Sequence, residues 1–256
     1  MITRETSEGL VCVHQVDHAR LAGRFADWWG GAALPHLEPR DSVLHAVANH
    51  DAGWPDLDEV PAWDPRSGRP HTYQSHGLAD SLGVAERSVQ RVAAVDPYAG
   101  WLVSRHFASM HESGEREAKD WVGEQVARQA ALVGQAAGRV PAVALEPRVL
   151  EANFDWLQLL DALSLAVIRD WDTWESRSMA RDYEGSMGVF RYRRYGSSTP
   201  RAVVGTVDPY PFIPVRLTEQ LPVRILPGLH WIGADTLTAA WHEARIVTVE
   251  VALTAG

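Results

Sequence analysis

Histidine and aspartate residues occur at five positions whose chemistry suits a metal ion. They are His18, the adjacent pair His50 and Asp51, His106, and Asp161. Imidazole nitrogens and carboxylate oxygens bind Zn, Mn, Fe or Co, and helical folds build metal sites from side chains that converge from different helices. The sequence therefore predicts a divalent transition metal cofactor, with one or two ions of Fe, Mn, Zn or Co.

Asp161 is the most unusual of these residues, because it interrupts the apolar run LQLLDALSL. A buried carboxylate is costly unless a cation or hydrogen-bond donors surround it. His18 shares one helical face with Leu21 and Phe25, although His14, four residues earlier, can take its place if the helix begins earlier. Each residue alone has an ordinary explanation, such as a hydrogen-bonded core histidine, so the metal hypothesis depends on the whole set.

Apolar residues recur at helical spacing over most of the chain before residue 184. Asp17, Asp41 and Asp96 are suitable N-cap residues, and Pro97 directly after Asp96 strengthens the third helix start. The expected helices cover approximately residues 17–29, 41–50, 78–94, 96–110, 115–137 and 146–170.

Short runs rich in Val, Ile, Tyr and Arg, such as VFRYRRY, RAVVGTV, VRIL and IVTVEVAL, follow residue 184 and predict strands. We expect a mainly α fold, α+β overall, in which residues 1–183 form a helical metal-binding domain. Residues 184–256 would then be a small β-rich C-terminal appendage packed on it. Residues 9–14 predict a short strand that could join this β part.

Composition limits the class of protein. The chain has 256 residues, of which 46% are hydrophobic and 22% charged, and a formal net charge of −9. That charge argues against a nucleic-acid partner, and no apolar run reaches the roughly 18 residues of a membrane span. One cysteine, Cys12, excludes an internal disulfide or a Cys-rich metal site. We expect a cytoplasmic protein with a small-molecule substrate and no nucleic-acid or membrane partner, for which a homodimer is one option.

Sequence motifs for other chemistries are absent. The chain has no GxGxxG, GxxxxGK[ST], GxSxG or HExxH motif. His111 and Glu112 begin like the last of these, but no second histidine follows at the required position.

The order of the candidate ligands resembles the HD superfamily, which comprises helical metal-dependent phosphohydrolases. The stretches DHARLAGRFADWW, VLHAVANHDAGW and LLDALSLAV carry this resemblance. It implies an HD-domain-like helical bundle in which His18, His50, Asp51 and Asp161 hold the first ion. Asp51 would also bridge to a second ion and take part in catalysis.

Members of that superfamily with two ions add two further histidines. His106 fits one of these positions, and either His76 or His71 fits the other, with His76 favoured because it directly precedes a helix. Trp54 stands where many HD hydrolases have Lys, which weakens the analogy to nucleotide hydrolases. Trp54, His71 and Arg69 are candidate substrate-binding residues. Arg105 is a candidate catalytic residue that could clamp phosphate, together with Arg20, Arg24 and Arg69.

A second resemblance covers nearly the whole chain. The stretches QVDHARLAG, HDAGWPDLDEVPAWDPRSGRP, DPYAGWLVSRH and TVDPYPF resemble the bacterial family called domain of unknown function 3891. This family implies no activity, so the chemistry comes from the HD resemblance alone.

Three functions follow as alternatives. The first is a hydrolase that acts on a small phosphate ester or related anionic metabolite through metal-activated water. The second is an oxygenase, because some HD-fold proteins hold two irons with the same ligand types and cleave C–C or C–P bonds. The third is a non-catalytic metal-binding or interaction protein.

Overall fold

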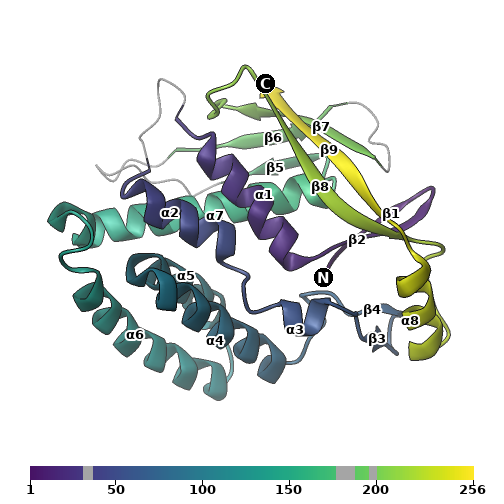
Figure 1. The fold of residues 1–256 in the computed structure, drawn as a ribbon, viewed down its shortest axis with the longest axis horizontal. Helices are drawn as coiled ribbons and strands as arrows, with labels where there is room; N and C mark the ends of the chain where they lie inside the picture. Colours follow the sequence, from purple (N-terminus) through teal and green to yellow (C-terminus); the bar gives the residue numbers. More distant parts are fainter. Residues whose placement is uncertain (31–36, 177–187, 196–200) are drawn as a thin grey trace.

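The chain folds into a seven-stranded sheet packed against a group of helices (Figure 1). The computed structural model describes residues 1–30, 37–176, 188–195 and 201–256. The helices are α1 (Gln15–Asp27), α2 (Arg40–Asn49), α3 (Pro55–Asp58), α4 (Leu78–Val95), α5 (Pro97–His111), α6 (Arg116–Ala136), the 3-10 helix η1 (Ala142–Leu145), α7 (Pro147–Ile168) and α8 (Ala234–Glu243). The strands are β1 (Ile2–Thr6), β2 (Gly9–Val13), β3 (Trp63–Asp64), β4 (Arg69–Pro70), β5 (Thr173–Glu175), β6 (Arg191–Arg194), β7 (Ala202–Asp208), β8 (Arg216–Leu226) and β9 (Ile246–Ala255).

The large sheet has the strand order β1-β2-β8-β9-β7-β6-β5. Neighbouring strands are antiparallel except β7 and β9, which are parallel. The long strands β8 and β9 form its centre. Alternate residues of β8, including Leu217, Leu221 and Val223, are buried in the same cluster as the helices, so one face of the sheet forms half of the core.

The predicted fold class is wrong. The strands expected after residue 184 are present as β6 to β9, and the strand expected near residues 9–14 joins them as β2, but the sheet also contains β1 and, directly after α7, β5. β2 pairs with β8, with Leu10 opposite Leu226. The sheet is therefore a major layer, and neither a mainly α nor an all-α description fits. β1 and β5 escaped prediction because they are short and polar.

The division into residues 1–183 and 184–256 stays a prediction. Its boundary falls within residues 177–187, which lie outside the described residues. Strands from both proposed parts join one sheet.

The helices form two layers on the sheet. α1 contacts β8, and α7 contacts β5, β6 and β7, whereas α4 and α6 pack with α5 on the far side (Figure 1). α7 lies between the sheet and α5, which explains why its apolar residues cover almost its whole circumference. Within the described ranges, no helix is long and apolar enough to cross a membrane.

One of the three predicted helix starts is confirmed. Asp96 is the N-cap of α5, and its side chain accepts hydrogen bonds from the backbone N–H groups of Tyr98 and Ala99 at 2.8 and 3.2 Å. α1 instead begins two residues before Asp17, and α2 begins one residue before Asp41. Both aspartates lie in the first turn, where a negative charge favours the helix dipole without a capping bond.

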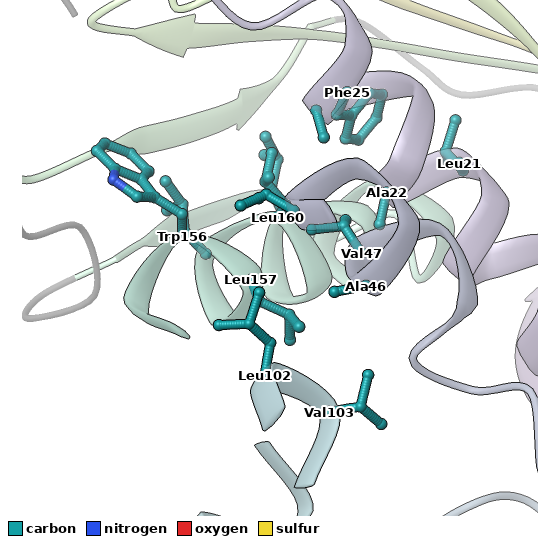
Figure 2. Close-up of a cluster of buried hydrophobic side chains, with 14 of the residues drawn as sticks. Leu21, Ala22, Phe25, Ala46, Val47, Leu102, Val103, Trp156, Leu157 and Leu160 are labelled. Carbon is teal, nitrogen blue, oxygen red and sulfur yellow. The ribbon is translucent and has the colours of Figure 1, made fainter. Parts of the chain in front are cut away.

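Four helices share the part of the core that positions the candidate ligands. Figure 2 shows side chains from α1, α2, α5 and α7 packed together. The labelled residues are Leu21, Ala22, Phe25, Ala46, Val47, Leu102, Val103, Trp156, Leu157 and Leu160. The same four helices carry or end at the five residues that the sequence singled out, so core packing fixes their relative positions.

Gly23 allows α1 and α2 to approach closely, because a Cβ atom at this position would lie 2.5 Å from the Cβ of Ala48. We expect Gly23→Ala to lower the free energy of unfolding by about 1–3 kcal/mol through overpacking. The matched control is Gly134→Ala on the exposed face of α6, where an added Cβ meets nothing within 4 Å. This control should gain up to about 1 kcal/mol from helix propensity. Urea unfolding measures the free energy of unfolding of both variants. An equal gain in stability for the two would contradict the close approach of α1 and α2.

Candidate metal centre

Five side chains converge at a buried point inside the helical group. His18 comes from α1, His106 from α5 and Asp161 from α7. His50 is the C-cap of α2, and Asp51 follows it. The most exposed of these side chains, that of Asp161, is 13% exposed. The structure thus brings together five of the six predicted ligands.

The distances between ligand atoms suit coordination. His18 Nε2 lies 2.8 Å from Asp161 Oδ1 and 3.8 Å from Asp51 Oδ2. His50 Nε2 lies 3.5 and 3.6 Å from the same two oxygens, and His106 Nε2 lies 3.8 Å from Asp161 Oδ2. Atoms that are each about 2.1 Å from one ion are separated by about 3–4 Å. The spacing therefore leaves room for an ion among these groups.

These atoms form two overlapping groups that could hold a metal ion. One comprises His18, His50 and Asp51, and the other comprises His50, His106 and Asp161. Within each group the ligand atoms lie within 4.8 Å of one another. His50 is common to both, which places its Nε2 at the centre of the cluster.

Hydrogen bonds on the far sides of two imidazoles fix which nitrogen faces the cluster with a lone pair. His50 Nδ1 lies 2.8 Å from the carbonyl oxygen of Val47, which can only accept, so Nδ1 carries the hydrogen. Ser164 Oγ donates to the carbonyl oxygen of Asp161 at 2.8 Å and therefore accepts from His18 Nδ1 at 2.7 Å. In the neutral rings both Nε2 atoms then present lone pairs, the arrangement found in metal-binding histidines.

The charges in the cluster call for a cation. Burial opposes a charged imidazole at His50, but Asp51 and Asp161 outweigh it and raise the pKa of His50 to about 9. Burial also acts to raise the pKa of Asp161, yet the neighbouring imidazoles of His18 and His50 hold that pKa well below its usual range. Burial raises the pKa of Asp51. Without an ion, a proton on His50 serves as the counter-charge.

Two buried nitrogens of the cluster have no hydrogen-bond partner among the described residues. They are His50 Nε2, which faces the carboxylates, and His106 Nδ1, on the far side of its ring. Unpaired buried polar atoms are rare, and a ligand or ion that is not part of the chain is one explanation. Burial lowers the pKa of His106 to about 4, so this imidazole is neutral near pH 7 and free to coordinate.

Trp54 holds one oxygen of Asp51 in place. Its Nε1 donates to Asp51 Oδ1 at 3.1 Å, which leaves Oδ2 directed toward His18 and His50. Trp54 also lines the pocket beside the cluster. Trp54 therefore orients a carboxylate of the cluster, whereas its predicted role in substrate binding stays a prediction.

His76 and His71 lie outside both groups of ligand atoms. The His76 ring contacts Trp54 at a centroid distance of 5.5 Å and stacks on His71 at 5.1 Å. His76 Nδ1 lies 3.7 Å from Asp80 Oδ2. The structure does not bring either residue to the ligand atoms, and their predicted roles stay predictions.

The arginines that the sequence suggested as a phosphate clamp have other partners. Arg105 pairs with Glu112 and Glu151 at 2.9 and 3.4 Å and covers the ring of Phe154. Arg69 pairs with Glu5 at 2.6 Å, and its Nε also donates to His230. Neither is among the residues that line the pocket.

A pocket of about 130 Å³ opens beside the cluster. Besides the five candidate ligands and Trp54, it is lined by Gln15, Tyr73, Ser81, Val84, Phe107, Met110, His111 and Leu165. Sequence reasoning missed all eight as pocket residues. Three of them carried a signal, since Gln15 lies three residues before His18, Met110 four after His106 and Leu165 four after Asp161. Each thus shares the helical face of a predicted ligand.

Comparison with known proteins places the chain in a family. The family described as Protein of unknown function (DUF3891) matches residues 1–228, which include every candidate ligand. Searches among curated proteins and among solved structures found no match. No comparison supports the resemblance to the HD superfamily, which stays an interpretation of the ligand order. Because the match covers most of the chain, this protein belongs to the family of unknown function DUF3891.

Proposed function

We propose that this protein is a metal-dependent hydrolase that acts on a small molecule through metal-activated water. The observation that carries the proposal is the buried convergence of Asp51 and Asp161 with imidazole lone pairs at the wall of a pocket. Two carboxylates at such a point need a cation. The pocket provides the access that a substrate requires, and its volume of about 130 Å³ suits a small one.

Each residue has a role in this proposal. His18, His50, Asp51 and Asp161 would hold the ion, with His106 as a further ligand. A bound ion lowers the pKa of a coordinated water toward 7 and polarises the bond that the water attacks. Around the ligands, Ser164, the carbonyl of Val47 and the indole of Trp54 hold the side chains in their coordinating orientations.

The arrangement favours one ion over two. His50 Nε2 belongs to both ligand groups, but one nitrogen coordinates one ion, and Nδ1 is bonded to Val47. His76, the favoured extra ligand for a second ion, lies outside both groups. The di-iron oxygenase would need a second complete ligand set, which the described residues do not offer. A non-catalytic structural site would normally be closed by protein ligands, whereas this one adjoins a pocket.

A phosphate ester remains a possible substrate of such a hydrolase. Among the described residues that line the pocket there is no Arg or Lys. The ion itself would therefore have to balance the charge of the phosphate.

Metal analysis tests the proposal directly. Protein purified without a tag or added metal should contain about one ion per chain by mass spectrometry, and EPR of the same sample should show no mixed-valent signal. Asp51→Ala should lose the ion and any hydrolytic activity but keep its helical circular dichroism, because it removes a ligand and no core contact. The matched control His76→Ala should keep the ion. Two irons with a mixed-valent signal would favour the oxygenase, and no metal after reconstitution would refute the proposal.

Ser164→Ala tests the support of His18. Losing the hydroxyl that accepts from His18 Nδ1 should weaken Co(II) binding by about 10–100-fold, the usual effect of removing an outer partner of a metal ligand. The control is Ser104→Ala, a buried serine on α5 that is bonded to Gln125 instead. Competition with a metal indicator measures both affinities. Equal affinities for the two variants would show that Ser164 does not orient a ligand.

Proton competition should make metal binding depend on pH. In the metal-free protein His50, with a pKa of about 9, carries a proton at pH 7, and coordination must displace it. Lower pH therefore weakens binding, and the apparent Kd for Co(II) should fall about tenfold per pH unit from pH 7 to 8.5 before levelling near pH 9. Calorimetry in buffers of different ionisation enthalpy should show about one proton released near pH 7.5. A Kd that does not change with pH would contradict the assignment of His50.

A further inference from the structure

The pocket beside the candidate metal centre is largely apolar away from the ligand atoms. Val84, Phe107, Met110 and Leu165 supply much of the wall. No Arg or Lys is found among the lining residues that the structure describes. A molecule with several negative charges would meet no protein cation there apart from imidazoles, whereas a molecule with an apolar body would be well accommodated.

Gln15 adds an unused hydrogen-bond acceptor to this wall. The residue is only 4% exposed, and its Oε1 accepts no hydrogen bond from the described residues. Its backbone N–H donates to Asp58 Oδ2 at 2.7 Å, which anchors the residue at the start of α1, one turn before His18. A buried acceptor without a donor is uncommon, and a bound molecule that carries an N–H group would supply the missing donor.

Tyr73 adds a donor. Its hydroxyl oxygen accepts from Arg169 Nη1 at 3.2 Å, while the hydroxyl hydrogen has no acceptor among the described residues. The backbone N–H of Tyr73 donates to the carbonyl oxygen of Met1 at 3.1 Å, which holds this segment at the pocket. Gln15 and Tyr73 therefore add one acceptor and one donor to the wall, the complement of an amide group, while the Ser81 hydroxyl and the His111 imidazole in the same wall lie 3.5 Å from each other.

We propose that the site takes a small, uncharged aliphatic amide. Its N–H group would donate a hydrogen bond to Gln15 Oε1, and its carbonyl group would face Tyr73 and the ion. This inference rests on the proposed hydrolase. In the reaction, the oxygen of water adds to the carbonyl carbon and the C–N bond breaks. The acid keeps the water oxygen, and the nitrogen leaves as an amine after gaining a proton from that water.

Isobutyrohydroxamic acid is a suitable probe, because it combines an apolar body and an N–H group with two oxygens that chelate a metal. Its N-methyl derivative lacks the N–H group. Co(II)-loaded protein, with its metal content measured first, is titrated with each compound and with AMP, and the visible spectrum reports binding. We expect the parent hydroxamate to bind about tenfold more tightly than the N-methyl compound, as the loss of one hydrogen bond predicts. AMP should bind more weakly than either.

A mutant cycle assigns the preference to Gln15. In Gln15→Met the affinity ratio of the two hydroxamates should fall from about ten to about one, because the acceptor is gone. The control Gln135→Met, at an exposed position of α6, should keep the ratio of the unmodified protein. Circular dichroism and metal content verify that both variants fold and bind Co(II).

The outcomes separate the two proposals. Failure of the unmodified protein to bind Co(II) overturns the hydrolase, and the amide inference with it. If the unmodified protein binds Co(II) but does not prefer the compound with the N–H group, only the amide inference is overturned. The same holds if AMP is the tightest ligand. Neither outcome requires a variant. A preference that persists in Gln15→Met overturns the role of Gln15.

Discussion

The contact between Asp161 and His18 joins the two helices that lie on the sheet, and the rest of the site depends on it. A carboxylate in the middle of α7 is tolerable only because imidazoles of α1, α2 and α5 surround it. The excess negative charge of two carboxylates then makes the cluster incomplete as a purely protein structure. An ion that completes the cluster would be held by side chains from four helices.

The apolar core around the cluster gives the site its rigidity. Small residues at the crossing of α1 and α2, among them Gly23 and Ala48, let the backbones approach, and this sets the separation of His18 and His50. The serine, carbonyl and indole partners then fix the rotations of the side chains. Packing thus controls the positions of the candidate ligands, and hydrogen bonds control the orientations of their side chains.

The sequence predicted much of the cluster and less of the fold. Residue type, helical spacing and the order of the ligands along the chain singled out His18, His50, Asp51, His106 and Asp161, because a polar residue within an apolar helix face is conspicuous. The structure brings these five side chains together. Gln15 and Tyr73 were not predicted as binding residues. Their importance lies in an acceptor and a donor that have no partner among the described residues, and residue spacing cannot reveal a missing partner. The size of the sheet was underestimated because β1 and β5 are short and polar, whereas the joining of the strand at residues 9–14 to the C-terminal strands was anticipated and is seen as the pairing of β2 with β8. His76 fitted the expected order along the chain and Arg105 was a candidate phosphate clamp, but neither is among the grouped ligand atoms, and Arg105 pairs with Glu112 and Glu151.

The pairing of β2 with β8 also links the site to a long-range contact along the chain. α1 directly follows β2 and contacts β8, so the first ligand helix reaches its final support only when a strand from the far end of the chain has docked. Closing so long a loop costs conformational entropy before any contact compensates for it, and such topologies fold slowly. α1 also packs directly on α2, its neighbour in sequence, and on α7, so His18 is positioned from two directions. One is the nearby helices that carry the other ligands, and the other is a sheet that needs both ends of the chain.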